Sequence, residues 1–232
     1  TLLYTDRLAV PRPHHAHAVL RAGAIVRESL AALGVATSEG ALPSGRLPGE
    51  LLGGFAPTPG ALVLLPGAGK PANRPPAELL AAIADRCVGE HPTLEVVLVG
   101  GPHDRSAAAS IQAQCRSAAP RSVCGVSLAE SAAWLESAAV VLGGDTGPLH
   151  LARALGRPVV GLFHAADSDR TSPAGLPGAA GVETFSGQVP CAPCCARRCQ
   201  RADGVRICLD TLKADAIAES VLGLIRQGVG TP

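Results

Sequence analysis

The sequence predicts an α/β fold, a Rossmann-like parallel sheet with helices on both faces. After Gly60, short apolar runs alternate with longer amphipathic stretches, which is the pattern of repeated βαβ units. The apolar runs are continuous, as expected of strands that are buried on both faces of a sheet. With 47% hydrophobic and 17% charged residues among 232, the chain can bury a packed core.

The elements follow in order along the chain. Apolar spacing predicts a helix over 17–33 that ends at Gly34, and the Pro-, Gly- and Ser-rich stretch 36–60 predicts a linker. Strands are then expected at 61–65, 94–99, 123–124, 139–142 and 159–163. The intervening helices are expected at 76–89, 105–118, 128–137 and 148–155. Ligands of such sheets bind beyond the carboxyl ends of the strands, so the loops that follow the strands should hold the site.

Composition excludes several classes of function. A net charge of +1 gives no broad positive field for duplex DNA, and 2% aromatic residues give no stacking platform for single strands, so no nucleic-acid partner is expected. No apolar run reaches the ~20 residues of a membrane-spanning helix, and the first residues do not show the charged-then-apolar pattern of a signal peptide, so we expect a cytoplasmic protein. The chain contains no Met, even at position 1, so we expect it to be a piece of a longer protein.

A glycine-rich turn, 66–70, directly follows the first strand after Gly60. Its glycines let backbone N–H groups approach an anion, and Lys70 or Arg74 can add positive charge to a phosphate clamp. The turn matches neither a Walker A sequence nor a dinucleotide fingerprint. A plain tight turn between strand and helix explains it equally well.

The segment 143–150 is the sharper motif, because it joins a buried strand to a helix N-terminus with unpaired N–H groups and a positive dipole end. Asp145 or Thr146 can cap the helix, Gly147 can admit a ligand to the backbone, and His150 follows one turn later. This arrangement predicts a diphosphate site. The alternative is that Asp145 and Thr146 only cap the helix and His150 is an ordinary polar residue.

Two further loops at strand ends carry polar side chains. Asp104, after the second strand, can accept hydrogen bonds from a ribose diol or can have a capping role. His164 and Asp167 follow the strand that ends at Phe163 and can line a sugar pocket, although loop composition alone often produces such residues.

The eight cysteines fall into two groups. Three lie among apolar neighbours and are expected to be buried small hydrophobic residues: Cys87, Cys115 and Cys124. Four others lie in one Arg-containing loop at a spacing that suits tetrahedral coordination of structural zinc or iron: Cys191, Cys194, Cys199 and Cys208. Cys195 is spare. In a reducing compartment we favour a metal over two disulfides or free thiols, and such a closed site would stabilise the loop without taking part in catalysis.

Taken in order, these motifs resemble glycosyltransferase family 9, the ADP-heptose:lipopolysaccharide heptosyltransferases. The resemblance covers nearly the whole chain, and its most specific part is the block Asp-Thr-Gly-Pro-Leu-His at 145–150. It implies the C-terminal, donor-binding half of a two-domain GT-B enzyme with its N-terminal domain largely missing. Residues 1–35 would be a remnant of the acceptor domain, 36–60 the linker, and 61–232 the nucleotide-sugar-binding domain with the Cys-rich loop 191–208.

The resemblance further implies a bacterial, inverting glycosyltransferase that needs no catalytic metal. Its donor would be a nucleotide sugar, ADP-heptose above others, and its acceptor the lipopolysaccharide core or a similar cell-surface molecule. Peripheral association with the cytoplasmic face of the inner membrane is a further expectation.

The family's binding residues carry over by motif. Asp145, Thr146 and Gly147 would meet the diphosphate and the sugar, and His150 the phosphate side. Asp104 would meet the ribose. Backbone atoms of Ala68 and Gly69 would face the phosphates.

This sequence departs from the family in two ways. The family places a Lys, an aromatic residue and a Pro shortly after the glycine turn, whereas this chain has Asn73, Arg74, Pro75 and Pro76, so Lys70 or Arg74 must supply the cation. The acceptor domain with its acidic catalytic base is absent, so the chain alone is expected to be inactive. Two alternatives stay open: a non-catalytic nucleotide-sugar-binding remnant, or another GT-B enzyme such as a nucleotide-sugar epimerase.

Overall fold

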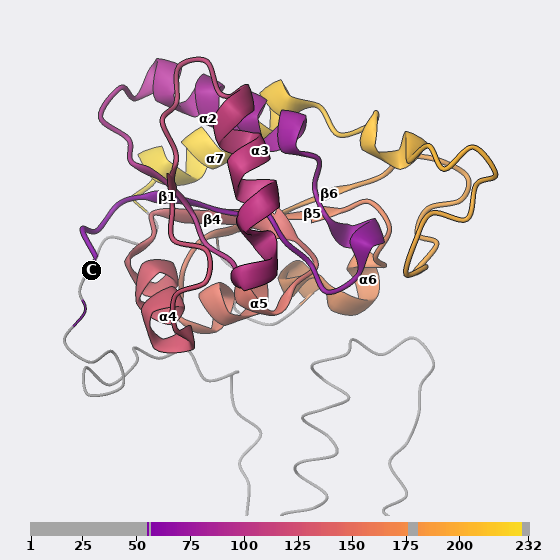
Figure 1. Ribbon diagram of the computed structural model, residues 1–232, viewed down its shortest axis with the longest axis horizontal. Coiled ribbons are helices and arrows are strands. Elements are labelled where there is room, and N and C mark those ends of the chain that lie inside the picture. The colour runs from indigo at the N-terminus through magenta and orange to yellow at the C-terminus, as the bar shows by residue number, and fades with distance from the viewer. Residues whose placement is uncertain (1–54, 56, 176–180, 229–232) are drawn as a thin grey trace, which may run out of the picture.

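The computed structural model describes residue 55 and residues 57–175 and 181–228 (Figure 1). Within these residues the chain forms a six-stranded, fully parallel sheet in the order β3-β2-β1-β4-β5-β6. The strands are β1 (Leu62–Leu65), β2 (Val96–Leu98), β3 (Arg121–Ser122), β4 (Val140–Gly144), β5 (Val159–Phe163) and β6 (Val182–Ser186). The α/β class expected from the sequence is confirmed.

Strand order reverses between β1 and β4. From β1 the chain builds outward through β2 to β3, and it then returns to the other side of β1 to place β4, β5 and β6. Leu62 is in register with Val96 on one side and with Val140 on the other. The two connections that leave β1 and β4 therefore diverge beyond their carboxyl ends, which is where doubly wound sheets bind ligands.

Helices cover both faces of the sheet (Figure 1). They are α2 (Ala77–Glu90), α3 (Arg105–Gln114), α4 (Leu128–Ser137), α5 (Gly147–Ala154), α6 (Ser168–Thr171) and α7 (Ala214–Arg226). Helices α2, α3 and α7 pack over one face, and α4 and α5 over the other.

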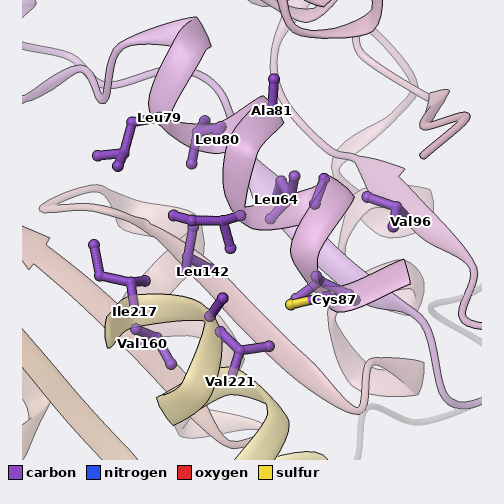
Figure 2. Close-up of a cluster of buried hydrophobic side chains, with 14 of the residues drawn as sticks. Leu64, Leu79, Leu80, Ala81, Cys87, Val96, Leu142, Val160, Ile217 and Val221 are labelled. Carbon is purple, nitrogen blue, oxygen red and sulfur yellow. The ribbon is translucent and has the colours of Figure 1, made fainter. Parts of the chain in front are cut away.

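Alternation along each buried strand divides the core into two layers. Leu62 and Leu64 point to the layer of α2, α3 and α7, whereas Val63 and Leu65 point to the layer of α4 and α5. Figure 2 shows the first layer, where strand side chains such as Leu64 meet residues of α2 and α7. Full burial of one such side chain contributes about 1.5–3 kcal/mol, so both faces stabilise the sheet.

Two predicted boundaries were wrong. The short edge strand is Arg121–Ser122 and not 123–124, because residues 121 and 122 are the ones in register with β2. Helix α3 ends at Gln114 and not at Ala118. The carboxylate of Asp85 on α2 accepts hydrogen bonds from the N–H groups of residues 116, 117 and 118, at 2.8–3.0 Å, and so holds this segment out of the helix.

Some elements of the structure were not predicted, and some predicted segments lie outside the described residues. No element was predicted after Phe163, yet α6, β6 and α7 follow it. The proposed helix over 17–33 and nearly all of the linker 36–60 lie outside the described residues. None of the helices in the described ranges has the length and apolarity needed to cross a bilayer.

Candidate functional site

The candidate site lies at the switch point between β1 and β4. The turn after β1 runs back across the end of β4: a Cβ placed on Gly144 would lie 2.2 Å from the carbonyl oxygen of Asn73. Gly144 is therefore required by this close approach of two backbones. The contact brings the turn 66–74 against the loop that leads into α5.

Asp145 connects these two segments through its carboxylate. The Asn73 side-chain amide donates to Oδ2 at 3.4 Å, and Nε2 of His150 lies 3.2 Å from Oδ1. Asn73 is only 4% exposed, whereas Asp145 and His150 are half-buried. One carboxylate thus fixes the turn after β1 and the first turn of α5 in a single arrangement.

The start of α5 is open. Thr146 is the N-cap residue, but among the described residues its side chain makes no capping hydrogen bond. Pro148 occupies the first turn, and a Cβ on exposed Gly147 would meet no described atom within 4 Å. The Asp145 carboxylate is turned to Asn73 and His150, so the helix start with its positive dipole end faces outward without a side-chain cap.

Asp104 lies close to the same turn. Its Oδ2 accepts a hydrogen bond from the N–H of Gly101 at 2.9 Å, so the carboxylate caps the short helical turn Pro102–Asp104 and, within the described residues, makes no capping hydrogen bond to α3. A Cβ on Gly67 would lie 2.1 Å from Asp104 Oδ1, so this glycine is required by the carboxylate. A Cβ on exposed Gly69, in contrast, would meet no described atom within 4 Å, so packing within the described residues does not require glycine there.

The two candidate cations differ in their surroundings. Nε of Arg74 donates to the carbonyl oxygen of Ala68 at 3.1 Å, so this guanidinium folds back onto its own turn. Lys70 is exposed and precedes the short helical turn Pro71–Asn73. Lys70 can therefore swing toward an anion, whereas Arg74 first stabilises the loop.

The four clustered cysteines line one small cavity of about 30 Å³, together with His164, Arg201 and Arg206. Further lining residues are Ala72, Ala165, Ala192 and Ile207, whereas Cys195 is not among them. As placed, no group of three or more Cys, His, Asp or Glu side chains in the described segments could hold a metal ion. The donor set still fits zinc or iron chemically, because four thiols share one cavity with two guanidinium groups that can offset thiolate charge.

Within this cavity, His164 and Cys208 have shifted pKa values. Burial, together with a smaller effect of nearby Arg206, lowers the pKa of His164 to about 4, although the backbone of Ala72 opposes the shift. Burial raises the pKa of Cys208, and the neighbouring Cys191 and Cys194 add to the rise. The expectation that His164 lines a sugar pocket was wrong in its placement, because this side chain is 1% exposed and lines the cysteine cavity.

The loop 187–208 also holds the turn after β1. Nη1 of Arg206 donates to the carbonyl oxygens of Arg74, at 2.8 Å, and Pro71, at 3.4 Å. The N–H of Ala72 donates to the carbonyl oxygen of Arg197 at 3.1 Å. The cysteine loop therefore supports the segment that carries Asn73, a connection that the sequence did not indicate.

The remaining expectations concern scattered cysteines and one acidic residue. Cys87 and Cys124 are buried, as expected, whereas Cys115 is only half-buried. Burial raises the pKa of Cys87 to about 12 and that of Cys115 to about 11, which keeps both thiols protonated. Asp167, considered for a sugar pocket, is the N-cap of α6 and accepts from the N–H of Asp169 at 3.1 Å.

A doubly wound parallel sheet, with glycine-rich loops and an uncapped helix start at its switch point, defines a Rossmann-like domain of the kind that binds nucleotides. The chain belongs to glycosyltransferase family 9 (heptosyltransferase), whose family model matches residues 2–203. The resemblance seen in the sequence is thereby confirmed. Comparison with curated protein sequences gave no match.

Solved structures share the fold. A family 9 glycosyltransferase from Veillonella parvula is similar at a TM-score of 0.69 and 17% identity, over 95% of this chain and 62% of that one. Escherichia coli ADP-heptose lps heptosyltransferase II is similar at a TM-score of 0.62 and 21% identity, over 80% of this chain and 54% of that one. Escherichia coli heptosyltransferase WaaC with ADP is similar at a TM-score of 0.63 and 18% identity, over 95% of this chain and 60% of that one. The chain thus spans a little over half the length of these proteins.

Proposed function

We propose that this chain is the donor-binding part of an inverting glycosyltransferase that transfers a heptose, or a related sugar, from ADP-heptose. The acceptor in this proposal is the lipopolysaccharide core or a similar cell-surface molecule, reached in the cytoplasm at the inner face of the membrane. Family membership supports the class of reaction. One of the similar Escherichia coli proteins is an ADP-heptose lps heptosyltransferase and another is a heptosyltransferase with ADP, which supports the choice of nucleotide.

One observation carries the proposal: the Asp145 carboxylate joins Asn73 and His150 beside the uncapped start of α5. A helix start of this kind favours a diphosphate, because its N–H groups and positive dipole end stabilise negative charge. Gly147 leaves room for phosphate oxygens at the backbone. Thr146 contributes its side chain to the diphosphate and sugar.

The other proposed contacts surround this point. Backbone atoms of Ala68 and Gly69 face the phosphates, and His150 lies on the phosphate side. Lys70 supplies the cation, with Arg74 as the second candidate. Asp104 binds the ribose through Oδ1, since its Oδ2 already accepts from Gly101.

In the proposed mechanism the acceptor hydroxyl attacks the anomeric carbon as the diphosphate leaves, which inverts the configuration. Charge that develops on the leaving group is stabilised by the α5 N–H groups and by Lys70, an arrangement that is already in place before reaction. An acidic residue of the family's acceptor domain takes the proton from the hydroxyl. No metal takes part in this step.

We also propose that Cys191, Cys194, Cys199 and Cys208 hold a structural zinc or iron ion. Support comes from the cavity that these four thiols share and from the position of Cys195 outside it. Elemental analysis of the chain purified under reducing conditions should give one zinc or iron per chain. Less than a tenth of an equivalent after reconstitution would contradict the proposal.

The donor site is tested by calorimetric titration of this chain with ADP, UDP and GDP. We expect ADP to bind at least tenfold more tightly than UDP or GDP, and Asp145→Ala to weaken ADP binding at least tenfold. Asp210→Ala, an exposed residue outside the site, is the matched control. Equal affinity for the three nucleotides would contradict the choice of donor.

Transfer is then measured with ADP-heptose and both family domains present. Heptose transfer with inversion would support the enzyme. ADP binding without transfer would instead support a nucleotide-sugar-binding remnant, and epimerised donor without transfer would support an epimerase.

A further inference from the structure

We propose that His164 belongs to the metal site as a positioning residue, its imidazole N–H donating a hydrogen bond to a metal-bound thiolate of the four-cysteine cluster. This inference rests on the proposed metal site and is independent of the donor nucleotide. It assigns a role to a histidine at the end of β5 that the glycosyl transfer does not use.

His164 is a buried polar side chain that lacks a hydrogen-bond partner in the part of the chain that the structure describes. It is 1% exposed, and neither ring nitrogen has a hydrogen-bond partner within the described residues. The backbone of Ala72 is near the ring, but no hydrogen bond to it is completed. Buried polar groups in native proteins are nearly always paired, so an imidazole in this state indicates a missing acceptor or ligand.

His164 lines the same cavity as the four thiols. Its backbone also lies beside Cys208: a Cβ on Gly187 would be 2.9 Å from Cys208 Cβ and 3.1 Å from the carbonyl oxygen of His164. A buried histidine thus lines a cavity together with cysteines that are exposed or half-buried.

The chemistry of the two groups is complementary. A neutral imidazole offers one N–H donor, and a thiol that loses its proton to bind a metal becomes an acceptor. Four thiolates around a divalent ion leave a net charge of −2 at the centre. An N–H that donates to a thiolate stabilises this charge, and the guanidinium groups of Arg201 and Arg206, which also line the cavity, can offset it.

Direct ligation by His164 is the competing arrangement. Four cysteines already complete a tetrahedral shell, so a histidine ligand would have to displace one of them. A hydrogen bond to sulfur lets all four thiols bind and gives the imidazole its partner. Outer partners of this kind orient the ligands and tune affinity.

The test compares His164→Phe, which removes the N–H donor, with His164→Gln, which restores one. His91→Gln, on a half-buried residue outside the cavity, is the matched control. Zinc affinity is measured by competition with a chelator, the ligand set by the absorption spectrum of the cobalt-substituted chain, and the stability of the metal-free chain by urea unfolding.

We expect His164→Phe to weaken zinc binding by about 10- to 100-fold, the usual effect of losing an outer partner. His164→Gln should recover most of the affinity, and all variants should keep a four-thiolate cobalt spectrum. Metal-free His164→Phe should be at least as stable as the parent chain, since an unpaired polar group is removed.

Three outcomes would overturn the inference. Unchanged zinc affinity in His164→Phe would show that the N–H has no role, and a cobalt spectrum that loses a nitrogen ligand in this variant would show direct ligation. A metal-free variant that unfolds more easily, with zinc affinity lost in proportion, would show a packing role. Failure of the unsubstituted chain to bind zinc or iron would remove the metal site itself, while ADP titration would still report on the donor site.

Discussion

The side-chain amide of Asn73 donates a hydrogen bond to the Asp145 carboxylate across a sequence separation of 72 residues. Asn73 belongs to the turn after β1, and Asp145 to the loop between β4 and α5. These are the two connections that diverge at the switch point, so this contact sets their relative position. His150 approaches the other oxygen of the same carboxylate.

The first prediction concerns this contact. Asp145→Ala should weaken ADP binding at least tenfold, about 1.4 kcal/mol, because it removes a proposed donor contact and frees both Asn73 and His150. Asn73→Ala should have a smaller effect, since it acts only through Asp145. Calorimetry on the double variant should show strong non-additivity, whereas simple addition of the two losses would mean that the residues are not coupled.

Substitutions at two glycines, Gly147 and Gly144, test ligand contact and folding separately. Gly147→Ala should leave the free energy of unfolding within about 0.5 kcal/mol of the parent, because the new methyl group meets no described atom, but it should weaken ADP binding by crowding the phosphates. Gly144→Ala should destabilise the fold by about 1–3 kcal/mol, because its Cβ would overlap the carbonyl of Asn73. Urea unfolding and ADP titration measure the two effects. Full ADP affinity in Gly147→Ala would place the phosphates elsewhere.

Arg206→Gln should loosen the turn 71–74. The substitution shortens the side chain and removes the guanidinium that pairs with the carbonyls of Arg74 and Pro71. We expect faster amide hydrogen exchange in the turn and ADP affinity reduced about three- to tenfold, equivalent to about 0.7–1.4 kcal/mol. Arg198→Gln, on an exposed residue of the same loop, is the control and should change neither quantity. Parent-like exchange in Arg206→Gln would show that the loop does not support the turn.

Asp85 should make the stability depend on pH. Burial alone would raise its pKa, but hydrogen bonds from the N–H groups of Ala118, Ser117 and Arg116 outweigh burial and hold the pKa below its usual value. A carboxylate with a lowered pKa stabilises the fold above its unfolded value of about 3.9, and this contribution is lost as the pH falls through the folded value.

Asp85→Asn should therefore cost about 1–3 kcal/mol at pH 7, because the three N–H groups lose a charged acceptor. The difference from the parent should shrink as the pH falls below about 4, because the carboxylate is protonated first in the unfolded chain and, at lower pH, in the folded one. Urea unfolding from pH 7 to pH 3 measures both, with Asp210→Asn as the control. A difference that does not change with pH would show that the charge of Asp85 is not involved.

The sequence predicted the central strands well because their apolar runs are continuous and their burial is complete. It missed β6, where Glu183 and Thr184 interrupt the apolar residues and every side chain is at least partly exposed. Helix α7 was also missed, although its buried residues, which include Ile217, Val221 and Leu222, follow a helical spacing. The end of α3 depended on Asp85, a tertiary contact that no local pattern contains.

The site was predicted in part. Strand-end motifs indicated the loops of Asp104 and Asp145, since parallel strands bring such loops to one edge. The sequence did not indicate that Asn73 pairs with Asp145 or that Arg206 supports the turn, because both contacts join segments that are distant along the chain. The burial of His164 beside the cysteines likewise depends on how β5 and the later loop pack together.

The bond from Arg206 to the carbonyl of Arg74 spans 132 residues, and this separation matters when the protein is synthesised. A nascent chain on the ribosome can assemble β1, β2 and β4 long before Arg206 has left the exit tunnel. Until then the 71–74 segment lacks its support, so nucleotide affinity should develop late in translation, after most of the sheet has formed.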